Sequence, residues 1–204
     1  MNFSSLNDAL HSITQSLGVP AIIILIILII LVLFELGGII TEYFVERIKK
    51  KPDVTRVLEE ITGKNNEEMV KIIKANPFQL KQKQVFFRFL KNGDMNTEEQ
   101  RLLATQLLSD EEARVLKRVV LTDVIARIGP MFGLLGTLIP LGPGLIALGQ
   151  GDTHGLASSL LTAFDTTIAG LATSAAAFVM SRVRKFWYQK DIATVETILE
   201  GLIR

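Results

Sequence analysis

RIGPMFGLLGTLIPLGPGL (residues 127–145) and LASSLLTAFDTTIAGLA (residues 156–172) are the two stretches of this 204-residue chain that decide its fold. The apolar segment around the first runs over 128–148 without a charge, and the segment around the second contains one charged residue, Asp165. Each is long enough to cross about 30 Å of hydrocarbon as a helix of about 20 residues. The turn between them, GQGDTHG, is so short that the two helices must be antiparallel neighbours.

A third apolar segment lies near the N-terminus, where residues 19–34 read VPAIIILIILIILVLF. With residues 36–40 beyond Glu35, it reaches the length of a membrane-spanning helix. We do not interpret it as a cleaved signal peptide, because no Lys or Arg precedes it and no cleavage site with small residues follows its apolar core. The sequence therefore predicts a retained first span.

The middle of the chain, 42–118, is polar, charged and helical in pattern. Capping boxes, in which two side chains three residues apart satisfy each other's free backbone donors, are predicted at Thr97 with Gln100 and at Ser109 with Glu112. We therefore predict an all-α membrane protein with three transmembrane helices and a cytoplasmic helical insertion.

Basic residues flank the three spans on one side only. They are Arg47, Lys49, Lys50, Lys51, Arg114, Lys117, Arg118, Arg182, Arg184 and Lys185, whereas residues 1–18 and 149–154 contain no Lys or Arg. The positive-inside rule places the N-terminus outside and the insertion and C-terminus in the cytoplasm. The predicted segments are an extracytoplasmic segment 1–18, transmembrane helix 19–41, a cytoplasmic helical domain 42–118, transmembrane helix 119–148, an extracytoplasmic turn 149–154, transmembrane helix 155–183 and a cytoplasmic C-terminal helix 184–204.

The last two spans differ from the first in carrying small residues at helical spacing. On the second span these are Gly129, Gly133, Gly136, Pro140 and Gly144, and on the third they include Ser159, Thr162, Thr166, Gly170 and Thr173. In lipid, helices associate through small residues that let their backbones approach closely. We therefore predict that these residues pack helix against helix.

Polar groups within the hairpin are candidates for function. Thr137 lies in the middle of the second span, and Thr166 and Thr167 lie in the middle of the third. A structural alternative holds for the threonines, since intramembrane hydroxyls commonly bond a carbonyl of their own or a neighbouring helix. Asp165 is different, because an ionised carboxylate at the centre of a span costs about 2.5–3.5 kcal/mol and should face a cavity or a partner.

Composition and motifs exclude several other classes of protein. There is no cysteine, and a net charge of +1 gives no field suited to nucleic acid. His11 and His154 are isolated histidines, so no metal site is expected. Motifs for nucleotide binding, zinc hydrolysis and serine hydrolysis are missing, and the spans contain no nucleophile paired with a base. We expect neither an enzyme nor a cofactor.

The two stretches quoted first resemble the hallmark segments of the MotA/TolQ/ExbB proton channel family, most closely its ExbB/TolQ branch. They carry G-L-x-G-T, ending at Thr137, and T-x-x-G-L, beginning at Thr167. The resemblance implies that these two threonines line a proton pore. The family's glutamate, five residues before the second threonine, is Thr162 here. We hypothesise that Asp165 replaces it, with Thr162 and Thr166 also on the proton pathway.

The resemblance also implies an assembly and a function. Family members form a ring, typically a pentamer, around the single spans of a small partner of the ExbD/TolR kind, whose membrane Asp takes part in proton movement. The expected protein is a ring-forming channel subunit in the inner (plasma) membrane of a prokaryote, driven by the proton motive force to do mechanical work or transport. The alternative is a scaffold that holds a partner's helices and conducts nothing. Protons are favoured over sodium because one acidic group with hydroxyls suffices for a proton relay.

Overall fold

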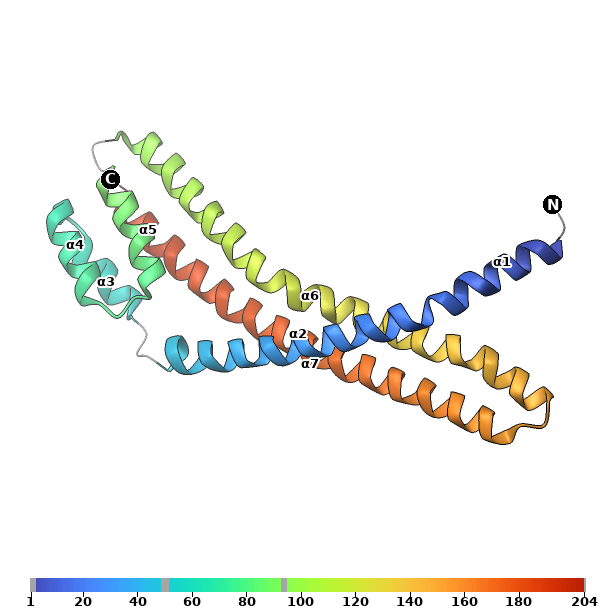
Figure 1. The fold of residues 1–204 in the computed structure, drawn as a ribbon. Helices are drawn as coiled ribbons and strands as arrows, with labels where there is room; N and C mark the ends of the chain where they lie inside the picture. The colour runs from blue at the N-terminus through green and yellow to red at the C-terminus, as the bar shows by residue number, and fades with distance from the viewer. Residues whose placement is uncertain (1–2, 49–51, 93–94, 204) are drawn as a thin grey trace. The chain divides into compact units, whose positions relative to one another are not determined.

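The computed structural model describes residues 3–48, 52–92 and 95–203, and every regular element in these ranges is helical (Figure 1). Its elements are α1 (Phe3–Ser16), α2 (Gly18–Glu42), a π-helical turn η1 (Tyr43–Arg47), α3 (Val54–Ile61), α4 (Asn66–Ala75), α5 (Leu80–Lys91), α6 (Thr97–Gly149) and α7 (Thr153–Leu202). Three helical stretches are long and apolar enough to cross a membrane, namely Ser5–Val45, Thr97–Gly149 and Thr153–Leu202. The predicted all-helical chain with three candidate spans is confirmed.

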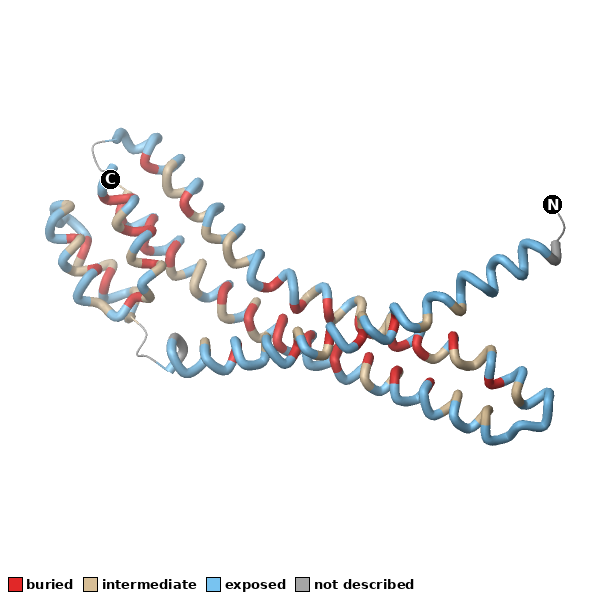
Figure 2. Tube along the Cα trace, viewed as in Figure 1, coloured by how far each residue is buried: buried red, intermediate tan, exposed pale blue. Residues whose placement is uncertain are grey.

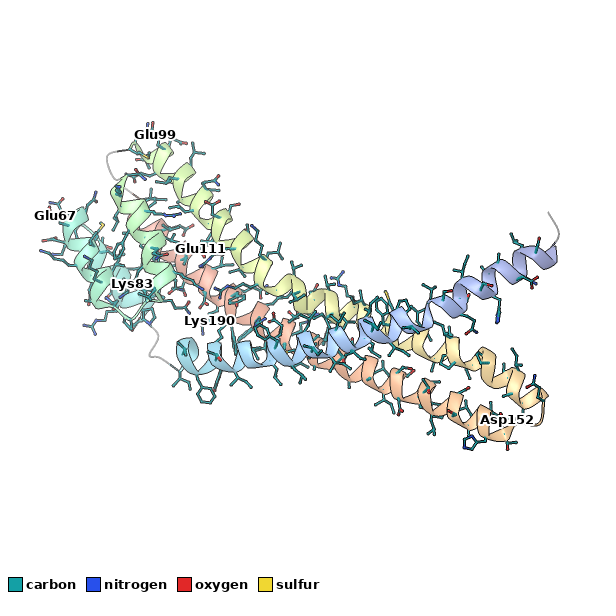
Figure 3. The ribbon with its side chains drawn as sticks, viewed as in Figure 1. Glu67, Lys83, Glu99, Glu111, Asp152 and Lys190 are labelled. Atoms are coloured by element: carbon teal, nitrogen blue, oxygen red, sulfur yellow. The ribbon has the colours of Figure 1, made fainter. Side chains whose placement is uncertain are left out.

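The chain divides into two compact units, which share α6 and α7. The apolar unit contains the described residues up to Gly38 together with Val120–Arg182, and the polar unit contains Ile39–Val119 with the described part of Val183–Arg204. Charged side chains concentrate in the polar unit. Among those labelled in Figure 3, Glu67, Lys83, Glu99, Glu111 and Lys190 belong to the polar unit, and Asp152 belongs to the turn between α6 and α7.

Helix α6 begins at a capping box one residue earlier than predicted. The backbone N–H of Glu99 donates to Asn96 Oδ1 at 2.8 Å, and the N–H of Asn96 donates to Glu99 Oε2 at 3.1 Å. The predicted box at Thr97 with Gln100 is wrong, because the Asn96 amide oxygen already caps the helix and leaves Thr97 in its first turn. The second predicted box, at Ser109, is also wrong, since that residue lies inside continuous α6.

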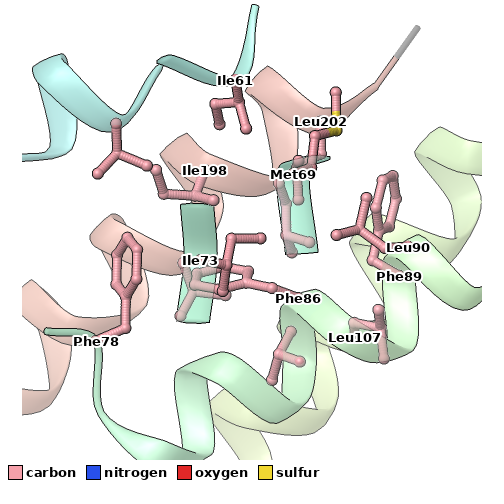
Figure 4. Packing of buried hydrophobic residues seen from close by; sticks show 14 residues of the cluster. Ile61, Met69, Ile73, Phe78, Phe86, Phe89, Leu90, Leu107, Ile198 and Leu202 are labelled. Atoms are coloured by element: carbon pink, nitrogen blue, oxygen red, sulfur yellow. The ribbon is translucent and has the colours of Figure 1, made fainter. Parts of the chain in front are cut away.

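The polar unit has a hydrophobic core, shown in Figure 4. Phe86, Ile61, Ile73 and Ile198 are completely buried, and the rings of Phe78 and Phe86 meet edge to face with centroids 5.2 Å apart. These residues come from α3, α4, α5, the loop before α5, and the C-terminal part of α7. The end of α7 is therefore part of this core.

The apolar unit buries far less of its hydrophobic surface. Figure 2 shows long exposed stretches along α2 and along the α6–α7 hairpin. Large side chains such as Phe34, Leu138, Phe164 and Ile168 are more than half exposed on the single chain. An apolar surface of this extent has to be covered by lipid or by other protein chains.

Phe86 gives a test of the core of the polar unit. Phe86→Ala should lower the stability of that unit by about 3–5 kcal/mol, because it removes a completely buried ring and leaves a cavity. The readout is thermal unfolding of the purified chain in detergent, together with the rate at which protease cleaves the polar unit. Leu80→Ala in the same helix is the control, since Leu80 is 82% exposed and should change neither quantity. Equal behaviour of the two variants would contradict this core.

Candidate functional site

The α6–α7 hairpin of the apolar unit is held together by an unusually close approach of two backbones. A Cβ atom added at Gly170 would lie 2.8 Å from Gly133 Cα and 2.8 Å from the carbonyl oxygen of Gly129. Real Cβ atoms almost never approach backbone atoms this closely, so any side chain at Gly170 would push the helices apart. Glycine at these positions therefore sets the separation of the two helices.

The other small residues singled out by the sequence lie along the same contact. Gly136 lies against Thr166, where an added Cβ would be 2.5 Å from the threonine Cβ, and Gly144 lies against Ser159 at 2.9 Å. Pro140 lies half-buried in α6 between these two contacts. The contact thus extends from Gly129 to Gly144, with hydroxyl-bearing residues of α7 facing glycines of α6.

Hydroxyl groups of α7 bond backbone carbonyls of α6 across this contact. Ser174 Oγ donates to the carbonyl of Ala126 at 2.5 Å, and Thr167 Oγ1 lies 3.4 Å from the carbonyl oxygen of Gly133. Such bonds satisfy hydroxyls that would otherwise be stranded in hydrocarbon. They also fix the antiparallel register of α6 and α7.

Thr137 and Thr167 meet at one edge of the hairpin. Their hydroxyl oxygens are 3.2 Å apart, and Thr137 Oγ1 also lies 3.1 Å from the carbonyl of Gly133 and 2.9 Å from that of Leu134. A hydroxyl donates one hydrogen bond and accepts two. One consistent arrangement has Thr137 donating to its own helix while accepting from Thr167, and the reverse polarity has Thr137 donating to Thr167. Both side chains are half-buried, so the pair lies at the surface of the single chain.

Thr166 and Thr162 have different environments from this pair. Thr166 is buried against Gly136, and its hydroxyl donates within α7 to the carbonyls of Thr162 or Ala163, each at 3.0 Å. Thr162 is exposed and donates to the carbonyl of Ser158 at 3.2 Å. Both bond their own helix, which is the structural alternative considered for intramembrane threonines.

Asp165 is exposed on α7 and is not brought to the threonine pair within one chain. It precedes Thr167 by two residues, which places the two side chains about 200° apart around the helix axis. Among the residues that the structure describes, none forms a hydrogen bond or an ion pair with Asp165. A carboxylate in this apolar segment therefore needs a partner from outside the chain.

Asp123 organises one end of the hairpin. Its Oδ2 accepts from Arg127 Nη2 at 2.9 Å, one turn along α6, and its Oδ1 accepts from Ser181 Oγ of α7 at 3.0 Å. The spacing of Asp123 and Arg127 by four residues made their pairing foreseeable, whereas Ser181, which is 58 positions away, gave no such signal. Asp123 thus links α6 to α7 at the end of the apolar segment where charged residues begin.

A buried polar cluster in the polar unit was missed by sequence reasoning. Tyr188 OH donates to Glu42 Oε2 at 3.1 Å, and Arg184 Nε lies 3.7 Å from the same oxygen. The side chains of Glu42 and Arg184 are only 10% and 8% exposed, so the ion pair is largely shielded from water. Next to it, the ring of Tyr43 stacks on Trp187 with centroids 6.0 Å apart. The cluster ties the end of α2 to α7.

The electrostatics of this cluster act on Tyr188, which lies beyond the predicted third span. Burial raises the pKa of the Tyr188 hydroxyl above its ordinary value of 10.0, and the negative charge of Glu42 raises it further. A hydrogen bond from Arg118 acts in the opposite direction. Tyr188 is therefore held as a neutral donor to Glu42.

Within the described ranges, no three His, Asp or Glu side chains gather in a way that would hold a metal ion. The features found are those of a helical membrane protein whose long helical hairpin presents paired hydroxyl groups in its apolar part. The model of the MotA/TolQ/ExbB proton channel family matches residues 53–197. The chain belongs to this family, whose members are channel proteins of the inner membrane. No curated protein and no solved structure matches the chain.

Gly170→Ala tests the close approach of the hairpin. The added methyl group would meet backbone atoms of Gly129 and Gly133, so we expect a loss of about 1–3 kcal/mol of stability. Gly37→Ala is the matched control, because a Cβ at Gly37 meets nothing within 4 Å. The measurement is the midpoint of thermal unfolding in detergent, followed by circular dichroism. A Gly170→Ala protein as stable as the Gly37→Ala protein would show that the helices do not approach this closely.

The pKa of Tyr188 tests the buried cluster. In a Tyr43→Phe background Tyr188 is the one remaining tyrosine, and the midpoint of the rise in its absorbance at about 295 nm should lie above pH 10, since its pKa is raised above 10.0. Neutral Tyr188 stabilises the cluster fully below pH 10, and this contribution is lost as the pH rises through the raised pKa. Glu42→Gln should move the pKa of Tyr188 down towards 10.0, because it removes the neighbouring negative charge. An unchanged titration in Glu42→Gln would contradict the contact.

Proposed function

We propose that this chain is the ring-forming channel subunit of an inner-membrane motor driven by the ion-motive force. In this proposal several copies, typically five, surround the single spans of a small ExbD/TolR-like partner, and protons passing through the assembly power mechanical work or transport. The observation that carries the proposal is the Thr137–Thr167 hydroxyl pair, 3.2 Å apart, in the hairpin of a member of the proton channel family.

The packing of the hairpin supports an assembly of several chains. Because Gly170 lies against Gly133 and Gly129, no space for an ion remains between α6 and α7 at that depth. A proton path must therefore follow an outer edge of the hairpin, where the threonine pair lies. Such an edge becomes a water-accessible path only when other helices enclose it, since an edge left open would face lipid.

The chemistry of the pair suits proton transfer. A hydroxyl both donates and accepts hydrogen bonds. Two adjacent hydroxyls can therefore relay a proton, each taking up one proton as it gives up another, and end uncharged. The carboxylate that binds and releases the proton is supplied by the partner, and Asp165 takes the place of the family's glutamate, which is Thr162 in this chain. One charge crossing a potential of 100 mV releases about 2.3 kcal/mol, so a few protons suffice for a mechanical step.

A second function is favoured by one observation. The hydroxyls of Thr137, Thr162 and Thr166 each have a carbonyl acceptor on their own helix, so they need no proton path to be satisfied. In that case the assembly would be a scaffold that holds a partner's helices and conducts nothing.

Substitution of the threonine pair separates these two functions. In the oligomer purified with its partner and reconstituted into liposomes, Thr137→Ala with Thr167→Ala should lower proton flux at least tenfold, because it removes both hydroxyls from the path. Thr137→Ser with Thr167→Ser keeps the hydroxyls and should retain most of the flux. The measurement is acidification of the liposome interior, reported by a trapped pH-sensitive dye under an imposed potential.

Thr197→Ala is the control for this experiment. Thr197 also donates to a carbonyl of its own helix, that of Ala193 at 2.8 Å, but it is exposed in the polar unit. Its substitution should leave the flux unchanged. Absence of flux from the unsubstituted complex, or full flux from the double alanine variant, would contradict the proposed path. A chain that native mass spectrometry shows to be monomeric would contradict the ring.

A further inference from the structure

The side chains of α7 divide into two flanks on either side of its contact with α6. Thr166 and Gly170 are buried against glycines of α6, and Thr173 and Ala177 are buried on the same side of α7 by the helical period. Thr167 lies on one flank, which we call the threonine flank together with its partner Thr137. Ser158, Thr162, Asp165, Ala172 and Ala176 are all exposed and lie on the other side of the contact, by the helical period of about 3.6 residues. We call these five residues the aspartate flank.

Helix α2 does not cover the threonine flank at this depth. A Cβ at Gly18 would lie 3.1 Å from Ile139 Cγ2, so the start of α2 packs on the Ile139 side of α6. Ile139 follows Thr137 by two residues, which places the two side chains about 200° apart around α6. Both flanks are therefore open to a second chain at the level of the threonine pair.

The two flanks present their polar groups at the same depth. Asp165 precedes Thr167 by two residues, which corresponds to about 3 Å along the helix axis. Thr167 in turn lies level with Thr137, since their hydroxyls are in hydrogen-bonding distance. The Asp165 carboxylate and the Thr137–Thr167 pair thus point in different directions around α7 but lie at nearly the same height along its axis.

The composition of the aspartate flank suits a neighbouring helix better than lipid. Its members are small or polar, and small residues let another helix approach closely. The large apolar side chains of α7, including Phe164, Ile168 and Leu171, point elsewhere around the helix and are the ones suited to lipid. The carboxylate of Asp165 adds a requirement, because it has no partner among the described residues of its own chain.

We infer that Asp165 of one subunit lies against the Thr137–Thr167 pair of the neighbouring subunit, so that each proton-path site is shared by two copies of this chain. The inference rests on the proposed ring. A closed ring joins one surface of each subunit to a different surface of the next. Subunits in one membrane stand at equal depth, so the aspartate flank of one can meet the threonine flank of the next with Asp165 level with the hydroxyls.

A shared site has a chemical consequence. The hydroxyl of Thr137 or Thr167 can donate across the subunit boundary to a carboxylate oxygen of Asp165, and this bond stabilises the charged form. When the carboxyl is protonated it becomes the donor, and the hydroxyl becomes the acceptor. Asp165 therefore keeps a hydrogen-bond partner in either state of its carboxyl while a proton passes to or from the carboxylate of the small partner protein.

Cysteine cross-linking tests the contact directly, because the natural chain contains no cysteine. Two differently tagged full-length chains, one with Asp165→Cys and one with Thr137→Cys, are co-expressed with the partner and oxidised in the membrane. A disulfide-linked dimer that carries both tags is expected. Phe164→Cys replaces Asp165→Cys in the matched control, since Phe164 is the adjacent residue and points about 100° away, and it should give at least tenfold less dimer.

Mixed rings test whether the site works across the boundary. Rings of Asp165→Asn chains alone, and of Thr137→Ala, Thr167→Ala chains alone, should lose proton flux. Mixed rings contain boundaries at which an intact Asp165 meets an intact threonine pair, so they should regain at least several-fold more flux than either pure ring. If the site lay within one chain, no mixed ring would recover. In the cross-linking experiment, Thr162→Cys on the same flank replaces Asp165→Cys if the Asp165→Cys chain fails to assemble.

The outcomes separate this inference from the proposed function. A conducting ring that requires Thr137 but yields no two-tag dimer and no recovery in mixed rings would overturn the shared site and leave the channel intact. A disulfide from Asp165→Cys to a cysteine placed in the partner's span, in place of the two-tag dimer, would assign Asp165 to the partner and also overturn it. A monomeric chain would overturn both.

Discussion

The contact between Gly170 and the backbone of Gly129 and Gly133 is the constraint on which the rest of the hairpin depends. In lipid there is little hydrophobic gain from bringing two apolar helices together, so packing and interhelical hydrogen bonds must hold them. Both need a short distance between the axes. Glycine provides that distance, and it brings Thr167 within reach of a carbonyl and a hydroxyl of α6. The same contact fills the space inside the hairpin and moves any ion path to its edges.

Two continuous helices follow different packing rules along their lengths. In the polar unit, α6 and α7 contribute Leu107 and Ile198 to a core of large apolar side chains, which the hydrophobic effect stabilises in water. In the apolar unit, the same helices pack through glycines and hydroxyls and leave their large side chains exposed. The change from one rule to the other matches the change from a charged to an apolar segment along each helix.

Hydropathy and motif spacing predicted the three candidate spans and singled out Thr137 and Thr167, because both signals are local in sequence. The cluster of Glu42, Arg184 and Tyr188 could not be predicted, since Glu42 lies more than 140 positions from the other two residues and only the fold brings Tyr188 to Glu42. The start of α6 was predicted one residue late, because Asn96 and Thr97 are both good caps and the choice between them depends on the loop. Local sequence patterns thus predict helices and the helix faces that carry small residues. They do not predict contacts that depend on tertiary packing.

The direction in which the Asp165 side chain points was the feature that the local sequence pattern predicted least well. Asp165 lies one turn after the family's glutamate position and two residues before Thr167. This short separation in sequence suggests that the two side chains lie close together. Around a helix two residues mean nearly opposite directions, at about 200°. Within one subunit the carboxylate and the hydroxyls are therefore separated by the helix itself. In the ring that we propose, a repeated subunit removes that separation, because the side that faces away in one copy faces towards the next. The proposed oligomer would then supply both the enclosure of the path and the partner that an intramembrane carboxylate requires.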